Sequence, residues 1–346
     1  MVTVLVVCHY NICGKIKRSE AGGGLFPSRS ILAGAGFFRQ WFRRIVGIVG
    51  NLILRQIHLG DVIVIVMVLQ FYVEPRKTKE AVREKFMNTV YISHLFPDQE
   101  FKEILDETPG LGIETIEFGI GDNLDHGQAA LTAYRERLGS YLTGRPVSVH
   151  GPFLDLNPGS FDTLIRQATM TRFRQAYACA KDLHAERIIF HSGFNPDTCY
   201  EIGWPDKAAE FWQEFLEQCD GTIAVHLENV LDLHWEVVAE ILDKADCPYF
   251  TACVDVGHVN TYSVQTPAEW LTGLAGKIGH LHLHDNNGKR DEHKALGTGT
   301  ISPDELFSAI CSCCPTSGMT FEHTDGAAVR QSLQVLFHCK PIGFPV

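Results

Sequence analysis

The chain has 346 residues, of which 45% are hydrophobic and 21% are charged, which is typical of a globular protein and excludes a disordered one. Its net charge of −11 is unevenly distributed: residues 1–86 carry 13 Lys and Arg against 5 Asp and Glu, whereas residues 87–346 carry 17 against 36, a net charge of −19. A body this acidic repels a phosphate backbone, and no basic track follows Met87, so we expect no nucleic acid partner.

The first 86 residues differ from the rest of the chain. They contain two apolar runs, Ile45 to Leu54 and Val62 to Val73, and neither reaches the roughly 20 residues that a membrane-spanning helix needs. No clear signal peptide precedes them. We predict that the functional protein begins near Met87 and that residues 1–86 are an unrelated extension, poorly ordered or not native. The alternative is membrane association through residues 45–73; otherwise we expect no membrane partner.

After Met87, short β-branched runs alternate with longer amphipathic stretches. The predicted strands are 89–93, 114–118, 146–150, 187–191, 222–228, 250–255, 279–284 and 319–322. The predicted helices include 160–184, 206–219, 234–244 and 303–311, the last capped by Ser302 or Thr300 with Pro303 in its first turn. Eight strands with helical crossovers in about 260 residues predict an α/β fold, a (β/α)₈ TIM barrel over residues 87–346.

A doubly wound open sheet is the alternative fold. No Gly-rich phosphate loop follows the first predicted strand, which disfavours that fold and a nucleotide cofactor. The eleven cysteines are scattered, and the C-x-x-C of Cys311 and Cys314 lacks the second pair that a structural zinc site needs. Their number without a disulfide pattern indicates reduced thiols, and we therefore predict a cytoplasmic protein.

The third to the eighth predicted strands all end in His, Asp or Glu. These residues are His150; His191; His226 and Glu228; Asp255 and His258; His280, His282 and His284; and Glu322 and His323. In a (β/α)₈ barrel the carboxyl ends of the strands form one ring that faces the active site. Imidazole and carboxylate ligands together suit Zn²⁺, Mn²⁺, Fe²⁺ or Co²⁺. The pattern therefore predicts a metal site on this ring.

Local spacing suggests roles for individual residues. His280, His282 and His284 share one side of a strand because side chains alternate, and His282 is the middle one. Asp255 and His258 both face inward if the chain turns between them, which Gly257 would permit. His226, His284 and His323 are interpreted as neighbours of the ligands. Taken alone, His150 or His191 would more often be a hydrogen-bonded barrel histidine than a ligand.

Three motifs carry a resemblance to a known family. Asp255-Val256-Gly257-His258 resembles its D-x-x-H, and His282-Leu283-His284-Asp285 resembles its H-x-x-D. The run from Asp291 through His293 and Leu296-Gly297 to Ile301 resembles D-x-H-x-x-L-G-x-G-x-I. Together, over about Met87 to Leu336, they resemble the xylose-isomerase-like TIM-barrel superfamily. This group includes sugar isomerases, ketose 3-epimerases, inosose dehydratases and AP endonucleases of the endonuclease IV type.

The resemblance implies a set of site residues. Glu228, Asp255, His282 and Glu322 would bind a divalent metal ion (Mn²⁺, Zn²⁺, Co²⁺ or Mg²⁺), and Glu228 and Glu322 would also be catalytic. His258, His191 and His150 would contact substrate. The endonuclease branch uses a wider, trizinc set, whose further positions are matched here by His150, His191, His258, Asp291 and His293.

The predicted function is that of a sugar or sugar-phosphate isomerase or epimerase, which transfers a proton through a metal-stabilised enediolate. The alternatives are a zinc-dependent phosphodiesterase of the AP endonuclease kind, an inosose dehydratase-like lyase, and a metal-bound sugar-binding protein. The charge of residues 87–346 disfavours DNA repair, as does Phe153, which stands where the repair enzymes typically carry tyrosine. We expect a small sugar or polyol as the partner and leave homo-oligomerisation open.

Overall fold

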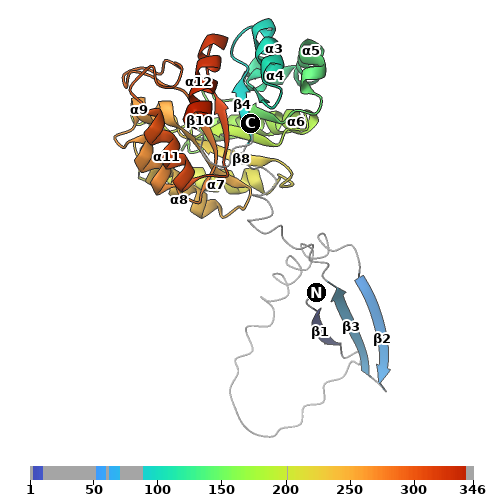
Figure 1. The fold of residues 1–346 in the computed structure, drawn as a ribbon. Helices are drawn as coiled ribbons and strands as arrows, with labels where there is room; N and C mark the ends of the chain where they lie inside the picture. The colour runs from blue at the N-terminus through green and yellow to red at the C-terminus, as the bar shows by residue number, and fades with distance from the viewer. Residues whose placement is uncertain (1–2, 11–51, 60–61, 71–88, 201, 340–346) are drawn as a thin grey trace. The chain divides into compact units, whose positions relative to one another are not determined.

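The computed structural model describes residues 3–10, 52–59, 62–70, 89–200 and 202–339. The chain divides into two compact units, Met1–Lys77 and Thr78–Val346 (Figure 1). The first unit contains a three-stranded antiparallel sheet in the order β1-β3-β2, formed by β1 (Thr3–Tyr10), β2 (Leu52–Leu59) and β3 (Val62–Gln70). The predicted boundary at Met87 lies outside the described residues, so the proposed start of the protein stays a prediction.

The second unit is a closed barrel of eight strands, and every neighbouring pair is parallel. The strands are β4 (Val90–Ser93), β5 (Gly112–Thr115), β6 (Val147–His150), β7 (Arg187–His191), β8 (Ala224–Glu228), β9 (Phe250–Asp255), β10 (Ile278–Leu283) and β11 (Gly318–Phe321). The predicted (β/α)₈ barrel is confirmed. The predicted strand 114–118 was placed too late, because Glu117–Gly119 forms a turn of 3₁₀ helix instead.

Helices follow the strands and cover the outside of the barrel (Figure 1). They are α3 (Asp98–Glu107), α4 (Gly121–Asp125), α5 (Gly127–Leu138), α6 (Thr163–Asp182), α7 (Trp204–Leu216), α8 (Trp235–Ala245), α9 (Val256–Tyr262), α10 (Pro267–Gly273), α11 (Pro303–Cys313) and α12 (Gly326–Cys339). None of the described helices is both long enough and apolar enough to cross a bilayer.

Capping residues set where several helices begin. The Asp162 carboxylate accepts the N–H of Leu164 at the start of α6, and Thr266 and Glu269 form a capping box at the start of α10. Pro303 opens α11 as predicted. Ser302 is the N-cap residue of that helix, as predicted, but its side chain makes no capping hydrogen bond.

The two faces of the barrel strands differ in polarity. Side chains such as Ile113, Val225 and Leu281 are fully buried in the apolar core of the unit. The alternate positions are polar although they are also buried: Glu114, Ser148, Arg187, His226, His280, His282 and Thr320. Barrel interiors of this class are usually filled by branched apolar residues. Here the interior instead holds polar side chains, which need hydrogen-bond or ionic partners.

Candidate active site and metal centre

Four of the predicted residues converge at the carboxyl ends of β8 to β11. Glu228 and Asp255 end β8 and β9, His282 lies near the end of β10, and Glu322 directly follows β11. Nδ1 of His282 lies 3.2 Å from Oε1 of Glu228 and 3.1 Å from Oε2 of Glu322. Its distance to Oδ2 of Asp255 is 3.8 Å. Three carboxylates therefore meet around one imidazole nitrogen.

Three further histidines contact the same carboxylates. Nε2 of His150 and Nε2 of His191 lie 3.4 Å and 3.6 Å from Oε2 of Glu228, and 3.2 Å from each other. Nδ1 of His258 lies 3.5 Å from Glu228 and 3.5 Å from Asp255. His150 and His191 end β6 and β7, so consecutive strands supply these contacts.

Asp291 and His293 extend the cluster from the loop between β10 and α11. Oδ2 of Asp291 lies 3.3 Å from Nε2 of His258 and 3.0 Å from Nε2 of His293. All nine residues named by the resemblance thus form one connected set of contacts. We call them the nine-residue cluster: His150, His191, Glu228, Asp255, His258, His282, Asp291, His293 and Glu322.

The path from Asp255 to His258 differs from the predicted turn. Asp255 is the N-cap of α9, and its Oδ1 accepts the backbone N–H of His258 at 2.7 Å. The chain turns inward by starting a helix, and Gly257 is not in the left-handed region. A Cβ on Gly257 would instead lie 1.9 Å from Cε1 of His284. The glycine therefore makes room for an imidazole and does not supply a turn.

The three histidines interpreted as neighbours have separate environments. His284 contacts two predicted ligands, with Nε2 at 3.1 Å from Asp255 and Nδ1 at 3.6 Å from Asp291. His323 contacts Ser332 and the carbonyl oxygen of His293. His226 lies at the other end of the barrel, where it lines a cavity of about 170 Å³. Of the three, His284 alone contacts side chains of the nine-residue cluster.

Asp285 organises the loop that carries Asp291 and His293. Its carboxylate accepts four backbone N–H groups, those of Asn286, Gly297, Gly299 and Ile301, at 2.8 to 3.1 Å. A Cβ on Gly299 would lie 2.1 Å from the carbonyl oxygen of Asn286. The Asp of the H-x-x-D motif and the glycines of the L-G-x-G motif therefore serve the same folded loop.

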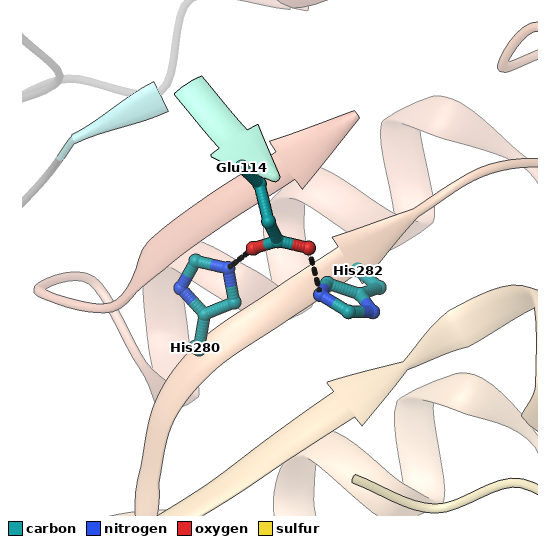
Figure 2. A group of neighbouring side chains, drawn as sticks. All are labelled: Glu114, His280 and His282. Atoms are coloured by element: carbon teal, nitrogen blue, oxygen red, sulfur yellow. Dashed lines mark ion pairs between the residues drawn. The ribbon is translucent and has the colours of Figure 1, made fainter. Parts of the chain in front are cut away.

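Sequence reasoning missed Glu114. This carboxylate is fully buried in β5, and its Oε1 lies 3.0 Å from Nε2 of His282, the ring nitrogen that faces away from the nine-residue cluster (Figure 2). The signal was a charged residue in an otherwise apolar run. It was hidden because the strand was predicted to begin at Glu114, where a carboxylate could have been solvated.

The cluster has the donor chemistry of a cation site. Both carboxylate oxygens of Glu228, Oε2 of Glu322 and Nδ1 of His282 are buried and make no hydrogen bond within the described part of the protein. Leaving buried carboxylate oxygens without hydrogen bonds is costly. Two groups of three cluster residues, His150 with His282 and Glu322 and His150 with His191 and Glu228, place one ligand atom each within 4.8 Å of the others. The residues therefore fit a divalent cation.

The electrostatics keep the carboxylates ionised. Burial acts to raise the pKa of Glu228, but the neighbouring imidazoles, His282 foremost, outweigh it and hold that pKa well below its usual value. Burial is likewise outweighed by His282 and His293 at Glu322, whose pKa is about 2. Ionised carboxylates are the form that binds a cation and the form that accepts a proton.

The histidines of the cluster differ in the direction of their pKa shifts. Burial lowers the pKa of His191 to about 4, so this imidazole is neutral. Burial acts in the same direction at His258, but Asp255 and Asp291 outweigh it and raise its pKa to about 10. Phe153 stacks on His191 with the ring centroids 4.6 Å apart, so its side chain packs against the cluster.

Sequence comparison identifies the family to which the barrel belongs. Residues 105–336 match the family model described as "Xylose isomerase-like TIM barrel". An uncharacterized protein of Methanocaldococcus jannaschii, MJ1311, is 33% identical over 176 residues, which cover 47% of this chain and 59% of that protein. The chain thus spans less than two thirds of this relative. A "Probable endonuclease 4" of Mycobacterium tuberculosis is 25% identical over 177 residues, 48% of this chain and 68% of that protein.

Comparison with solved structures agrees on the fold. A crystal structure of a D-tagatose 3-epimerase-like protein superposes with a TM-score of 0.60 at 25% sequence identity. The match covers 72% of this chain and 96% of that chain. Its coverage is consistent with a match to the barrel, because residues 87–346 are about three quarters of the sequence.

Proposed function

Because the chain belongs to the xylose isomerase-like TIM-barrel family, we propose that it is a metal-dependent isomerase or epimerase of a small sugar, sugar phosphate or polyol. The observation that carries the proposal is the pair Glu228 and Glu322, whose carboxylates both lie against Nδ1 of His282, at 3.2 Å and 3.1 Å. Two ionised carboxylates that face one space can remove a proton from a substrate carbon and return one.

Glu228, Asp255, His282 and Glu322 would hold the metal ion. A divalent cation at this position would supply Lewis acidity toward the carbonyl and hydroxyl oxygens of a ketose and stabilise enediolate charge. Three carboxylates and one imidazole suit Mn²⁺, Zn²⁺, Co²⁺ or Mg²⁺. The buried oxygens of Glu228 and Glu322 that lack hydrogen bonds within the described structure support this assignment.

The remaining residues of the cluster would handle the substrate. His258, His191 and His150 offer imidazole nitrogens around Glu228, and neutral His191 can donate or accept a hydrogen bond. One carboxylate would take the proton and the other would return it. Return to the opposite face of the same carbon gives an epimer, and return to the neighbouring carbon gives an isomer.

The proposal is tested by exchanging each carboxylate for its amide. We expect Glu322→Gln and Glu228→Gln to lower kcat on a ketose substrate by roughly 10² to 10⁴-fold, the usual contribution of a general acid or base. Bound metal is measured in each variant by elemental analysis, so that loss of the cation is distinguished from loss of proton transfer. Glu292→Gln, in the same loop as Asp291, is the matched control. Full turnover by metal-loaded Glu322→Gln would refute the assignment.

A zinc-dependent phosphodiesterase is the second candidate. It is favoured by the five further residues of the nine-residue cluster, which together with the central four form a set large enough for more than one metal ion. It is disfavoured by the charge of −19 on residues 87–346. Cleavage of abasic-site DNA together with about three zinc ions per chain would establish it. Dehydration of an inosose without epimerisation would instead indicate the lyase.

A further inference from the structure

Beneath the nine-residue cluster, a second layer of buried polar side chains surrounds Glu114. Oε2 of Glu114 lies 2.8 Å from the hydroxyl of Ser148 and 2.8 Å from the hydroxyl of Thr320. Each hydroxyl can donate to this oxygen, so Oε2 has two donors. Oε1 forms an ion pair with Nε2 of His282 at 3.0 Å, and neither of these two atoms makes a hydrogen bond within the described structure (Figure 2).

The proton position on His280 follows from Arg187. Nη1 of Arg187 lies 3.0 Å from Nδ1 of His280. A guanidinium can only donate, so Nδ1 accepts and the ring proton is on Nε2. Nε2 lies 2.8 Å from Oγ1 of Thr320, which therefore accepts from His280 and donates its own proton to Glu114.

These contacts form a directed chain of donors from Arg187 through His280 and Thr320 to Glu114. With Oε2 saturated by hydroxyls, Oε1 is the acceptor left for His282. Nε2 of His282 lies 3.0 Å from Oε1, and Nδ1 lies 3.2 Å and 3.1 Å from Glu228 and Glu322, so the ring is held between carboxylates on both sides. A cation bound between Nδ1 and the carboxylates of Glu228 and Glu322 would take the lone pair of Nδ1, and the one ring proton would then be on Nε2, which faces Glu114.

We propose that Glu114 is a positioning residue that fixes the proton of His282 on Nε2 and so presents Nδ1 as the metal ligand. The inference rests on the proposed metal-dependent function and names a residue outside the nine-residue cluster. A carboxylate that holds the second nitrogen of a ligating histidine orients the ring and raises its basicity, and its loss usually weakens metal binding 10- to 100-fold.

Glu114, His280 and His282 are close enough to form a cation site themselves, but their partners argue against it. Oε2 already accepts two hydroxyls, and both nitrogens of His280 are engaged by Arg187 and Thr320. A cation here would break these hydrogen bonds and would lie beside the buried guanidinium of Arg187. The group is therefore a support for His282 and not a second centre.

The first test measures cation affinity and not turnover. Full-length wild-type protein, Glu114→Gln and Ser148→Ala are titrated with Co²⁺, whose visible absorption also reports the ligand geometry. We expect Glu114→Gln to bind Co²⁺ about 10 to 100 times more weakly, because an amide can turn its NH₂ toward Nε2. Ser148→Ala keeps the carboxylate and should change the affinity less than about threefold. Equal affinity of wild type and Glu114→Gln would overturn the inference.

The second test needs no variant at Glu114. Nitrogen-15 NMR of ¹⁵N-histidine-labelled, Zn²⁺-loaded wild-type protein reports which ring nitrogen carries the proton, and His282→Gln identifies the signal. We expect a proton on Nε2 and none on Nδ1; the reverse would overturn the inference. Absence of the proposed metal site would differ from both results, because wild-type protein would then bind neither Co²⁺ nor Zn²⁺. Failure of the isomerase or epimerase activity alone would appear as metal-loaded wild-type protein without turnover and would leave both results unchanged.

Discussion

Asp232 is a buried carboxyl group outside the nine-residue cluster. Its Oδ2 accepts the hydroxyl of Ser192 at 2.6 Å and the N–H of Val230 at 3.0 Å, whereas Oδ1 has no hydrogen bond within the described structure. Burial raises the pKa of Asp232 to about 6. The protonated form is thus favoured by the fold, so its stabilising contribution is complete below the unfolded pKa of about 3.9 and is lost as pH rises through 6.

Replacement of the Asp232 carboxyl by an amide removes the loss of stability that accompanies ionisation of the buried carboxyl. Relative to wild type, we expect the unfolding free energy of Asp232→Asn to increase by roughly 2–3 kcal/mol between about pH 4 and pH 8. Urea unfolding of both proteins at the two pH values measures the change. A difference between the proteins that is the same at both pH values would contradict the buried, proton-binding environment of Asp232.

The buried carboxylates of the barrel differ in how well the sequence predicts them. Glu228, Asp255 and Glu322 were recognisable because each carboxylate follows an apolar strand whose end can be located. Glu114 has no such mark, since its partners Ser148 and Thr320 are ordinary strand residues far away in the chain. Its importance depends on barrel closure, which brings β6 and β11 within reach of the carboxylate on β5.

At the level of elements, the loop between β10 and α11 is held by Asp285. Four backbone N–H groups point to this one carboxylate, and the loop supplies Asp291 and His293. The sequence indicated the motif as a whole. It did not indicate that Asp285 holds the backbone of the loop while Asp291 and His293 join the nine-residue cluster. Similarly, Gly257 was correctly singled out and wrongly explained, because the neighbour that requires it, His284, is on another strand end.

Removal of the Asp285 carboxylate should loosen this loop. Hydrogen bonds to a charged acceptor contribute about 1.5–3 kcal/mol each, so we expect Asp285→Ala to lower the unfolding free energy by more than about 3 kcal/mol. We also expect the amides of Gly297, Gly299 and Ile301 to lose hydrogen-exchange protection. Glu292→Gln, a change at a half-buried side chain in the same loop that does not contact these amides, should leave them protected. Unchanged protection in Asp285→Ala would contradict the proposed role.

For the whole molecule, the proposed cation couples the ends of several strands. A ligand that binds only the folded state at about 100 times its Kd adds about 2.7 kcal/mol to the stability. For a unit of this size that corresponds to a rise in Tm of about 5–11 °C. We expect this rise with Mn²⁺ or Zn²⁺, its reversal by EDTA, and its loss in Glu228→Gln. A Tm that is insensitive to both metals would contradict a shared cation.

The first unit raises a separate question about the whole molecule. Residues 1–86 are basic and the remainder is acidic, and the three-stranded sheet β1-β3-β2 belongs to a compact unit distinct from the barrel. We predict that the functional protein begins near Met87. A peptide map of the protein purified from its natural host should then contain few or no peptides from before Met87. Abundant upstream peptides would contradict this start.

The order of the barrel strands has a consequence for biosynthesis. Of the four residues proposed to hold the cation, Glu322 comes last and directly follows β11, the final strand of the barrel. A nascent chain that has left the ribosome only as far as β10 carries the other three but cannot enclose the ion. Tight metal uptake would therefore begin only when synthesis is nearly complete, and a chain truncated before β11 would be released without its metal.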